Sequence, residues 1–116
     1  MVPTPAIAEY LHGIPADEQT DELAALSESF FIAPFDLRAA SIAGEIASRK
    51  EYRDRFNLAN RPGRNVMRTD LQILSTAIAF GASHIVTANL VDYNLFAGNR
   101  IRVMEVPNME EQGKLF

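Results

Sequence analysis

Oxygen-bearing side chains at four positions of the sequence could together hold a divalent cation. Asp70 stands at the start of an apolar helical segment that leads into the strand-like run HIVTAN, residues 84–89. Asn89 ends that run, Asp92 follows three residues later, and Glu9 lies in a short helical segment near the N-terminus. The carboxyl ends of parallel strands collect ligands, and Mg²⁺ takes oxygen ligands from separate elements. We therefore expect Asp70, Asn89 and Asp92 to approach one edge of a sheet.

Each of these residues also has an ordinary structural explanation. The helix macrodipole favours an aspartate in the first turn of a helix, and for Asp70 alone this is the better explanation. Asn89 and Asp92 would equally cap the turn that follows a strand, and Glu9 would be a solvated helix residue. No single position is diagnostic, whereas the four together favour a cation site.

Other kinds of catalytic centre have little support in the sequence. The chain has no cysteine, which excludes a disulfide framework, a thiolate metal site and a cysteine nucleophile. His12 and His84 are the only histidines, and neither has the neighbours of a catalytic triad. Gly81 and Gly98 are isolated, so they do not form a glycine-rich phosphate loop.

Length and composition indicate one globular domain. The chain has 116 residues, of which 47% are hydrophobic and 22% charged, as in ordinary soluble domains. No apolar run reaches the roughly 18–20 residues that span a bilayer, and the first residues lack the basic region of a secretory signal. We expect a cytoplasmic protein with no membrane partner.

The charge is unevenly distributed along the chain. The net charge is −4, which argues against a general nucleic-acid coat. Seven of the eleven basic residues nevertheless fall between positions 49 and 68, opposed there only by Glu51 and Asp54. Such a segment could bind a polyanion locally, although a solvated basic loop explains the charges equally well.

Helices and short strands alternate in the predicted secondary structure. Apolar spacing predicts helices over residues 4–12, 17–29, 37–49 and 69–80, and strands over residues 30–35, 84–89 and 101–106. Asp36 is the expected N-cap of the third helix, and LVDYNLF after the second strand is a turn or short helix. Pro62-Gly63 favours a frayed helix end and a loop over residues 50–65. This alternation predicts an α/β domain with a mostly parallel sheet.

Within this frame the C-terminal half resembles a PIN domain. TDLQILSTAIAFGASHIVTANLVDYNLF followed by IRVMEVP has the family's acidic residue, small-residue helix, glycine, T-x-(D/N) strand end and following aspartate-aromatic pair. The matching residues are Asp70, Ala77, Gly81, Thr87, Asn89, Asp92 and Tyr93. PTPAIAEYLHG resembles the helix that carries the family's second acid, here Glu9, and FIAPFD resembles the strand and helix between them.

The resemblance implies a three-layer domain over residues 1–107, with a C-terminal tail at 108–116, and a VapC-type toxin ribonuclease that uses Mg²⁺ or Mn²⁺. Glu9, Asp70 and Asp92 would be its catalytic and metal-binding acids. Thr87 and Asn89 would position the phosphate or water, and Arg61, Arg64 and Arg68 would contact RNA. The implied partners are RNA, an antitoxin protein and a second copy in a homodimer.

One family element has no counterpart in the sequence given. PIN domains begin with a strand that ends in an aspartate and lies in the middle of the sheet, whereas this sequence starts with MVPTPAIAEY. The resemblance therefore implies a sheet without its middle strand and a cluster with one carboxylate fewer. Three explanations stay open: a longer natural chain, an inactive relative that still binds a partner, or a second chain that fills the gap.

Two other functions remain in view. A non-catalytic module would keep the PIN scaffold to bind an antitoxin, RNA or another copy of itself. An unrelated small α/β protein would use the same acids only as caps.

Overall fold

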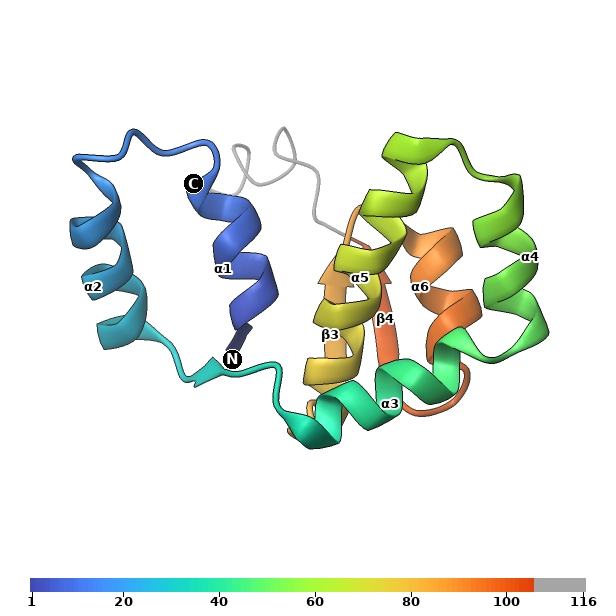
Figure 1. Cartoon of the computed structure of the whole chain (residues 1–116). Coiled ribbons are helices and arrows are strands. Elements are labelled where there is room, and N and C mark those ends of the chain that lie inside the picture. The colour runs from blue at the N-terminus through green and yellow to red at the C-terminus, as the bar shows by residue number, and fades with distance from the viewer. Residues whose placement is uncertain (106–116) are drawn as a thin grey trace, which may run out of the picture.

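A computed structural model describes residues 1–105 as a mixed α/β chain in which helices predominate (Figure 1). The predicted tail at 108–116 lies outside the described residues. In chain order the elements are β1 (Val2–Pro3), α1 (Thr4–Leu11), α2 (Gln19–Ser29), β2 (Ile32–Ala33), α3 (Leu37–Ala47), α4 (Lys50–Leu58), α5 (Arg61–Ala79), β3 (His84–Thr87), α6 (Leu90–Ala97) and β4 (Arg102–Glu105).

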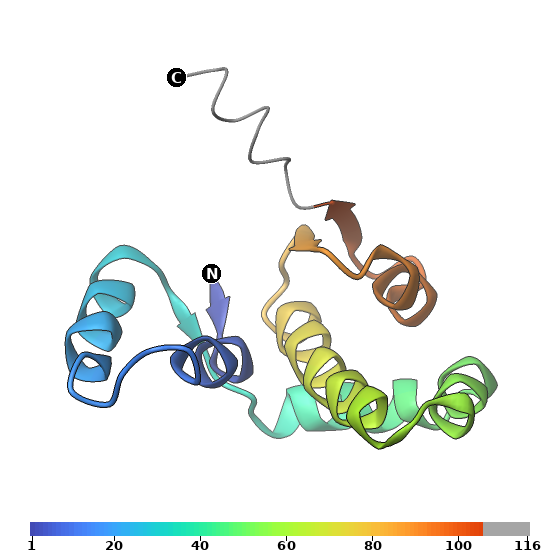
Figure 2. The same ribbon diagram turned by 90° about the horizontal axis from the view of Figure 1, so that it is seen from above.

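The strands of the described residues pair in parallel, as expected, but they form two sheets rather than one. β1 pairs with β2, Val2 opposite Ile32, and β3 pairs with β4, from His84 opposite Arg102 to Thr87 opposite Glu105. Figure 2 shows the two pairs standing apart, the first beside α1 and the second beside α6. The mixed α/β class is thus confirmed, whereas a single central sheet is not present in residues 1–105.

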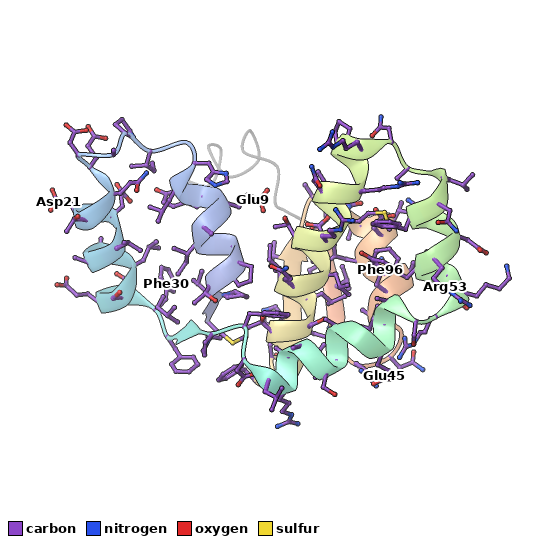
Figure 3. All side chains as sticks on the ribbon, viewed as in Figure 1. Glu9, Asp21, Phe30, Glu45, Arg53 and Phe96 are labelled. Carbon is purple, nitrogen blue, oxygen red and sulfur yellow. The ribbon has the colours of Figure 1, made fainter. Side chains whose placement is uncertain are left out.

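The hydrophobic core lies where α3, α5 and α6 pack together. α3 has its predicted start, because the Asp36 carboxylate accepts the Ala39 amide at 2.9 Å and caps the helix. Ile46, Leu74 and Phe96 are each at most 2% exposed at the contacts of these helices. Figure 3 shows Phe96 among the helices of this half of the molecule. α5, the helix that precedes β3, is therefore anchored in the hydrophobic core.

The predicted loop over residues 50–65 is wrong. Most of this segment is helical, as α4 and the first turns of α5, and only a short break separates the two. Pro62 falls in the first turn of α5, where a missing N–H costs nothing. The Asn60 side chain accepts the Gly63 amide at 2.8 Å, so this proline and glycine begin a helix instead of breaking one.

The N-terminal part packs more loosely than the rest. α2 has no buried residue, and at its C-terminal end Phe30 and Phe31 are 50% and 62% exposed. α1 meets the remaining structure mainly through α5. No helix in residues 1–105 combines the length and apolarity that crossing a membrane requires.

Candidate functional site

Asp70, Asn89 and Asp92 come together, as the sequence predicts. The Asn89 side-chain nitrogen donates to Asp70 Oδ2 at 3.1 Å and to Asp92 Oδ2 at 3.2 Å. α5 supplies Asp70, the turn after β3 supplies Asn89, and the first turn of α6 supplies Asp92. One amide group therefore holds two carboxylates from different elements beside each other, at the carboxyl end of a parallel strand.

The position of Asp70 in its helix weakens the ordinary explanation of this residue. The sequence predicts a helix start near Thr69, which would place Asp70 in the first turn. The helix begins at Arg61 instead, so Asp70 is in its middle. Because the macrodipole acts within the first turn, it gives no reason for an aspartate at this position. The Asp70 side chain instead accepts hydrogen bonds from the side chains of Asn89 and Tyr93.

Tyr93 also belongs to the cluster, although the sequence alone assigns it no role. Its hydroxyl donates to Asp70 Oδ1 at 3.0 Å, and the side chain is 4% exposed in the core. Tyr93 lies four residues after Asn89, one helical turn further along α6. Residues four apart lie on the same face of a helix, so this spacing is the sequence signal that could have placed Asn89 and Tyr93 together, facing Asp70.

The cluster shifts the acidity of its members. Burial raises the pKa of Asp70, and the negative charge of Asp92 raises it further, while the hydrogen bonds from Asn89 and Tyr93 oppose these effects. Burial is also the main cause of the raised pKa of the Tyr93 hydroxyl, followed by the charge of Asp70 and its hydrogen bond, and then by the charge of Glu9. Two carboxylates that repel one another in a half-buried site favour a cation nearby.

Arg55 supplies a cation from within the chain. Its guanidinium, on α4, forms an ion pair with Asp92 Oδ1, an oxygen that is buried and has no well-aligned hydrogen bond. Arg55 and Asp92 also line an open cavity of about 390 Å³ beside Met67 and Gly63. Any external cation that binds Asp92 must therefore compete with Arg55.

Glu9 lies near this cluster but outside its hydrogen bonds. It is exposed on α1 and lines a hollow with Thr69 and Gln72 of α5 (Figure 3). Its charge contributes to the raised pKa of Tyr93, which places it within electrostatic range of the cluster. Within residues 1–105, no group of three acidic or histidine side chains is close enough to hold a metal ion. The structure thus unites two of the three predicted acids.

The structure also defines the positions of Thr87 and of the three arginines predicted to bind RNA. The Thr87 hydroxyl accepts the Asn89 backbone amide at 3.0 Å, which fixes the turn that carries Asn89. Arg64 donates to the Phe56 carbonyl oxygen at 2.9 Å and, with Arg68, stacks on the Phe56 ring. Arg61 is exposed at the start of α5. Arg64 and Arg68 therefore already stabilise the junction of α4 and α5.

The donor set fits a divalent cation in part. The Asp70 and Asp92 carboxylates are neighbours with mutual repulsion, and oxygen donors of this type suit Mg²⁺ or Mn²⁺. Asp92 Oδ1 is buried and has no hydrogen bond within residues 1–105, but it is held in the ion pair with Arg55, which a metal ion would have to displace. The oxygen donors at this site are thus the two carboxylates and the polar turn, while Glu9 lies apart from them on the facing helix.

Comparisons with protein-family models, with curated proteins and with solved structures gave no match. The geometry of the residues is accordingly what supports a function for this chain.

Proposed function

We propose that this protein is a cytoplasmic, metal-dependent endoribonuclease of the PIN/VapC toxin type, with a PIN-like three-layer arrangement and Mg²⁺ or Mn²⁺ as cofactor. The observation that carries the proposal is the junction of Asp70 and Asp92 on the Asn89 amide. Asp70 and Asp92 come from different helices, and both are among the metal-binding acids that the family resemblance implies. An antitoxin and a second copy of the chain are the protein partners that belong to this proposal.

Each residue of the cluster has a defined task in such a reaction. Asp70 and Asp92 would hold the ion, and Glu9 would complete its acidic surroundings from α1. A bound divalent ion supplies the charge that polarises a phosphodiester and acidifies a water molecule. Asn89 keeps the two carboxylates together and Tyr93 fixes the rotation of Asp70. These contacts set the carboxylate orientation before RNA binds.

The basic segment supplies the RNA-binding side in this proposal. Arg61 is free to contact phosphates at the start of α5, while Arg64 and Arg68 present a positive surface over Phe56. Such arginines would position the RNA backbone without reading its sequence. Binding through them is expected to weaken as the salt concentration rises.

Cleavage of single-stranded RNA by the purified chain in Mn²⁺ tests the proposal. Asp70→Asn and Asp92→Asn should each reduce the cleavage rate at least about 100-fold, as loss of an essential charge-stabilising group does. Asp17→Asn is the matched control, since this exposed acid lies in the α1–α2 loop, and its rate should equal that of the unaltered protein. Equal, metal-independent rates in all four proteins would refute the assignment.

A second candidate function is a non-catalytic binding module. It is favoured by Arg55, which already neutralises Asp92, and by the separation of Glu9 from the other two acids. Thermal unfolding in rising Mn²⁺ discriminates between the two functions, because a ligand of the folded state must stabilise it. A concentration of ten times Kd adds about 1.4 kcal/mol, whereas no rise in Tm at about 1 mM Mn²⁺ supports the binding module.

A further inference from the structure

An apolar groove runs between the two small sheets. Its volume is about 570 Å³, and its lining comes from β1 on one side, β3 on the other and the C-terminal half of α5. Phe31, Phe80 and Val86, all in this lining, are 62%, 37% and 50% exposed. Figure 2 shows β1 and β3 on either side of this space. Large apolar side chains gathered in one hollow are typical of a binding surface.

The β3 side of the groove has unpaired backbone groups. The Arg102 amide donates to the Ser83 carbonyl oxygen at 3.2 Å, so Ser83 faces β4. Because residues along a parallel strand bond alternately to the two sides, the N–H and C=O groups of His84 and Val86 point away from β4. Within residues 1–105, β3 pairs with β4 alone. These four groups therefore lie on an open strand edge beside the apolar lining.

The β1 side contributes packing more than hydrogen bonds. The Val2 amide already donates to the Phe31 carbonyl oxygen at 2.9 Å, and Pro3 has no N–H to offer. Proline is usual on an edge strand, where it can accept a hydrogen bond through its carbonyl oxygen but cannot donate one. A molecule in the groove would thus bond mainly to β3 and pack against β1 and α5.

We propose that this groove binds an extended, uncharged and apolar segment of another polypeptide as an added strand beside β3. Only an extended backbone presents donors and acceptors at the spacing of His84 and Val86. The side chains of the lining include no Asp, Glu, Lys or Arg, and all except Ser83 and His84 are apolar, so an apolar segment without charges is the best match for them. The proposal concerns partner binding and does not depend on the nuclease assignment.

A different polypeptide suits the groove better than a second copy of this chain. The apolar strand-forming runs in residues 1–105 are already paired as β2, β3 and β4. A second copy would have to unpair one of these strands to donate it. A free segment from a partner has no such pairing to lose.

The test uses an uncharged, blocked synthetic peptide, acetyl-Thr-Thr-Val-Ile-Val-Thr-amide, and the same peptide with alternate backbone amides N-methylated. Amide hydrogen exchange of the protein is followed by NMR. With saturating unmodified peptide, exchange at His84 and Val86 should slow at least about tenfold, because pairing protects an amide. The N-methylated peptide keeps the side chains but loses the donors, so it should bind at least about tenfold more weakly and give no protection.

Protein variants locate the binding site. Val86→Asp places a charge in the apolar groove and should weaken peptide binding at least about tenfold. Val91→Asp is its matched control, at an exposed position on α6 outside the groove, and should leave binding unchanged. If Val86→Asp fails to fold, the comparison of the two peptides still decides the question.

Three results with the peptides would overturn the proposal. They are the absence of binding at millimolar peptide, equal affinity for the two peptides, and binding without protection of His84 and Val86. Protection of the same amides that grows with protein concentration in the absence of peptide would also overturn it, since the occupant would then be a second copy.

Discussion

The hydrogen bond from Tyr93 to Asp70 can be removed with almost no change in shape. Tyr93→Phe keeps the buried ring and deletes only the hydroxyl, so no cavity is created in the core. A hydrogen bond to a charged group contributes about 1.5–3 kcal/mol. Asp70 is only half-buried and keeps its bond to Asn89, so water can replace part of the loss. We expect a destabilisation near the lower limit, about 1.5 kcal/mol at pH 7.

The loss should depend on pH with a definite sign. The folded-state pKa of Asp70 lies above its ordinary value of 3.8. Because the folded-state pKa is the higher one, protonated Asp70 stabilises the folded protein. This contribution to stability is fully present below pH 3.8 and is lost as the pH rises through the folded-state pKa. The Tyr93 hydrogen bond holds this pKa down, so Tyr93→Phe raises it further. The difference between the two proteins should be larger at pH 7 than at pH 3.5.

Urea unfolding at the two pH values measures this difference, and an NMR titration of the Asp70 carboxyl measures its pKa. At pH 7 the urea midpoint should fall by about 1 M. Tyr52→Phe is the matched control, since Tyr52 is 5% exposed in the same core and its hydroxyl makes no hydrogen bond within residues 1–105. Equal losses in the two variants, or a Tyr93→Phe loss that does not change with pH, would refute the reasoning.

Four further substitutions test local features of the structure. Asp36→Ala removes the N-cap of α3 and should cost about 1 kcal/mol in chemical denaturation, and an unchanged midpoint would contradict the cap. Gly44→Ala should add about 0.5–1 kcal/mol, because the site is helical and open, whereas Gly98→Ala at φ +57° should cost about 1–2 kcal/mol. Arg55→Gln should cost about 1 kcal/mol at low salt and less at 1 M salt, and a salt-independent loss would argue against the ion pair with Asp92.

Much of the fold could be predicted because its helices follow local rules. The apolar stripe and Asp36 cap of α3 are confirmed, as are the helices over residues 4–12 and 17–29 to within a few residues. The strands at 84–89 and 101–106 correspond to β3 and β4. The run FFIAPF yields only the two-residue strand β2, since Phe30 and Phe31 remain outside the core. Hydrophobicity alone does not tell a short edge strand from a longer buried one.

The start of α5 could not be predicted because the same residues can break a helix or begin one. Pro62-Gly63 predicts a break in the helix, but Asn60 caps the segment and Arg64 bonds to the last turn of α4. Arg64 contacts Phe56, eight residues earlier, and such a contact is invisible to a window of local propensity. The same early start moves Asp70 from a helix end to a helix middle.

The candidate site shows a similar division between local and distant information. Asn89 and Asp92 belong to one turn, and a family pattern indicates them together with Asp70. Arg55 comes from α4, in a segment predicted as loop, and its pairing with Asp92 follows from how α4 packs against α6. In the proposed metal site, Arg55 and an external cation would compete for Asp92. Arg55 has the advantage in this competition, because an ion pair within the chain costs no entropy of association. In the proposed function, the competition between Arg55 and a divalent ion for Asp92 therefore decides whether the site binds a metal.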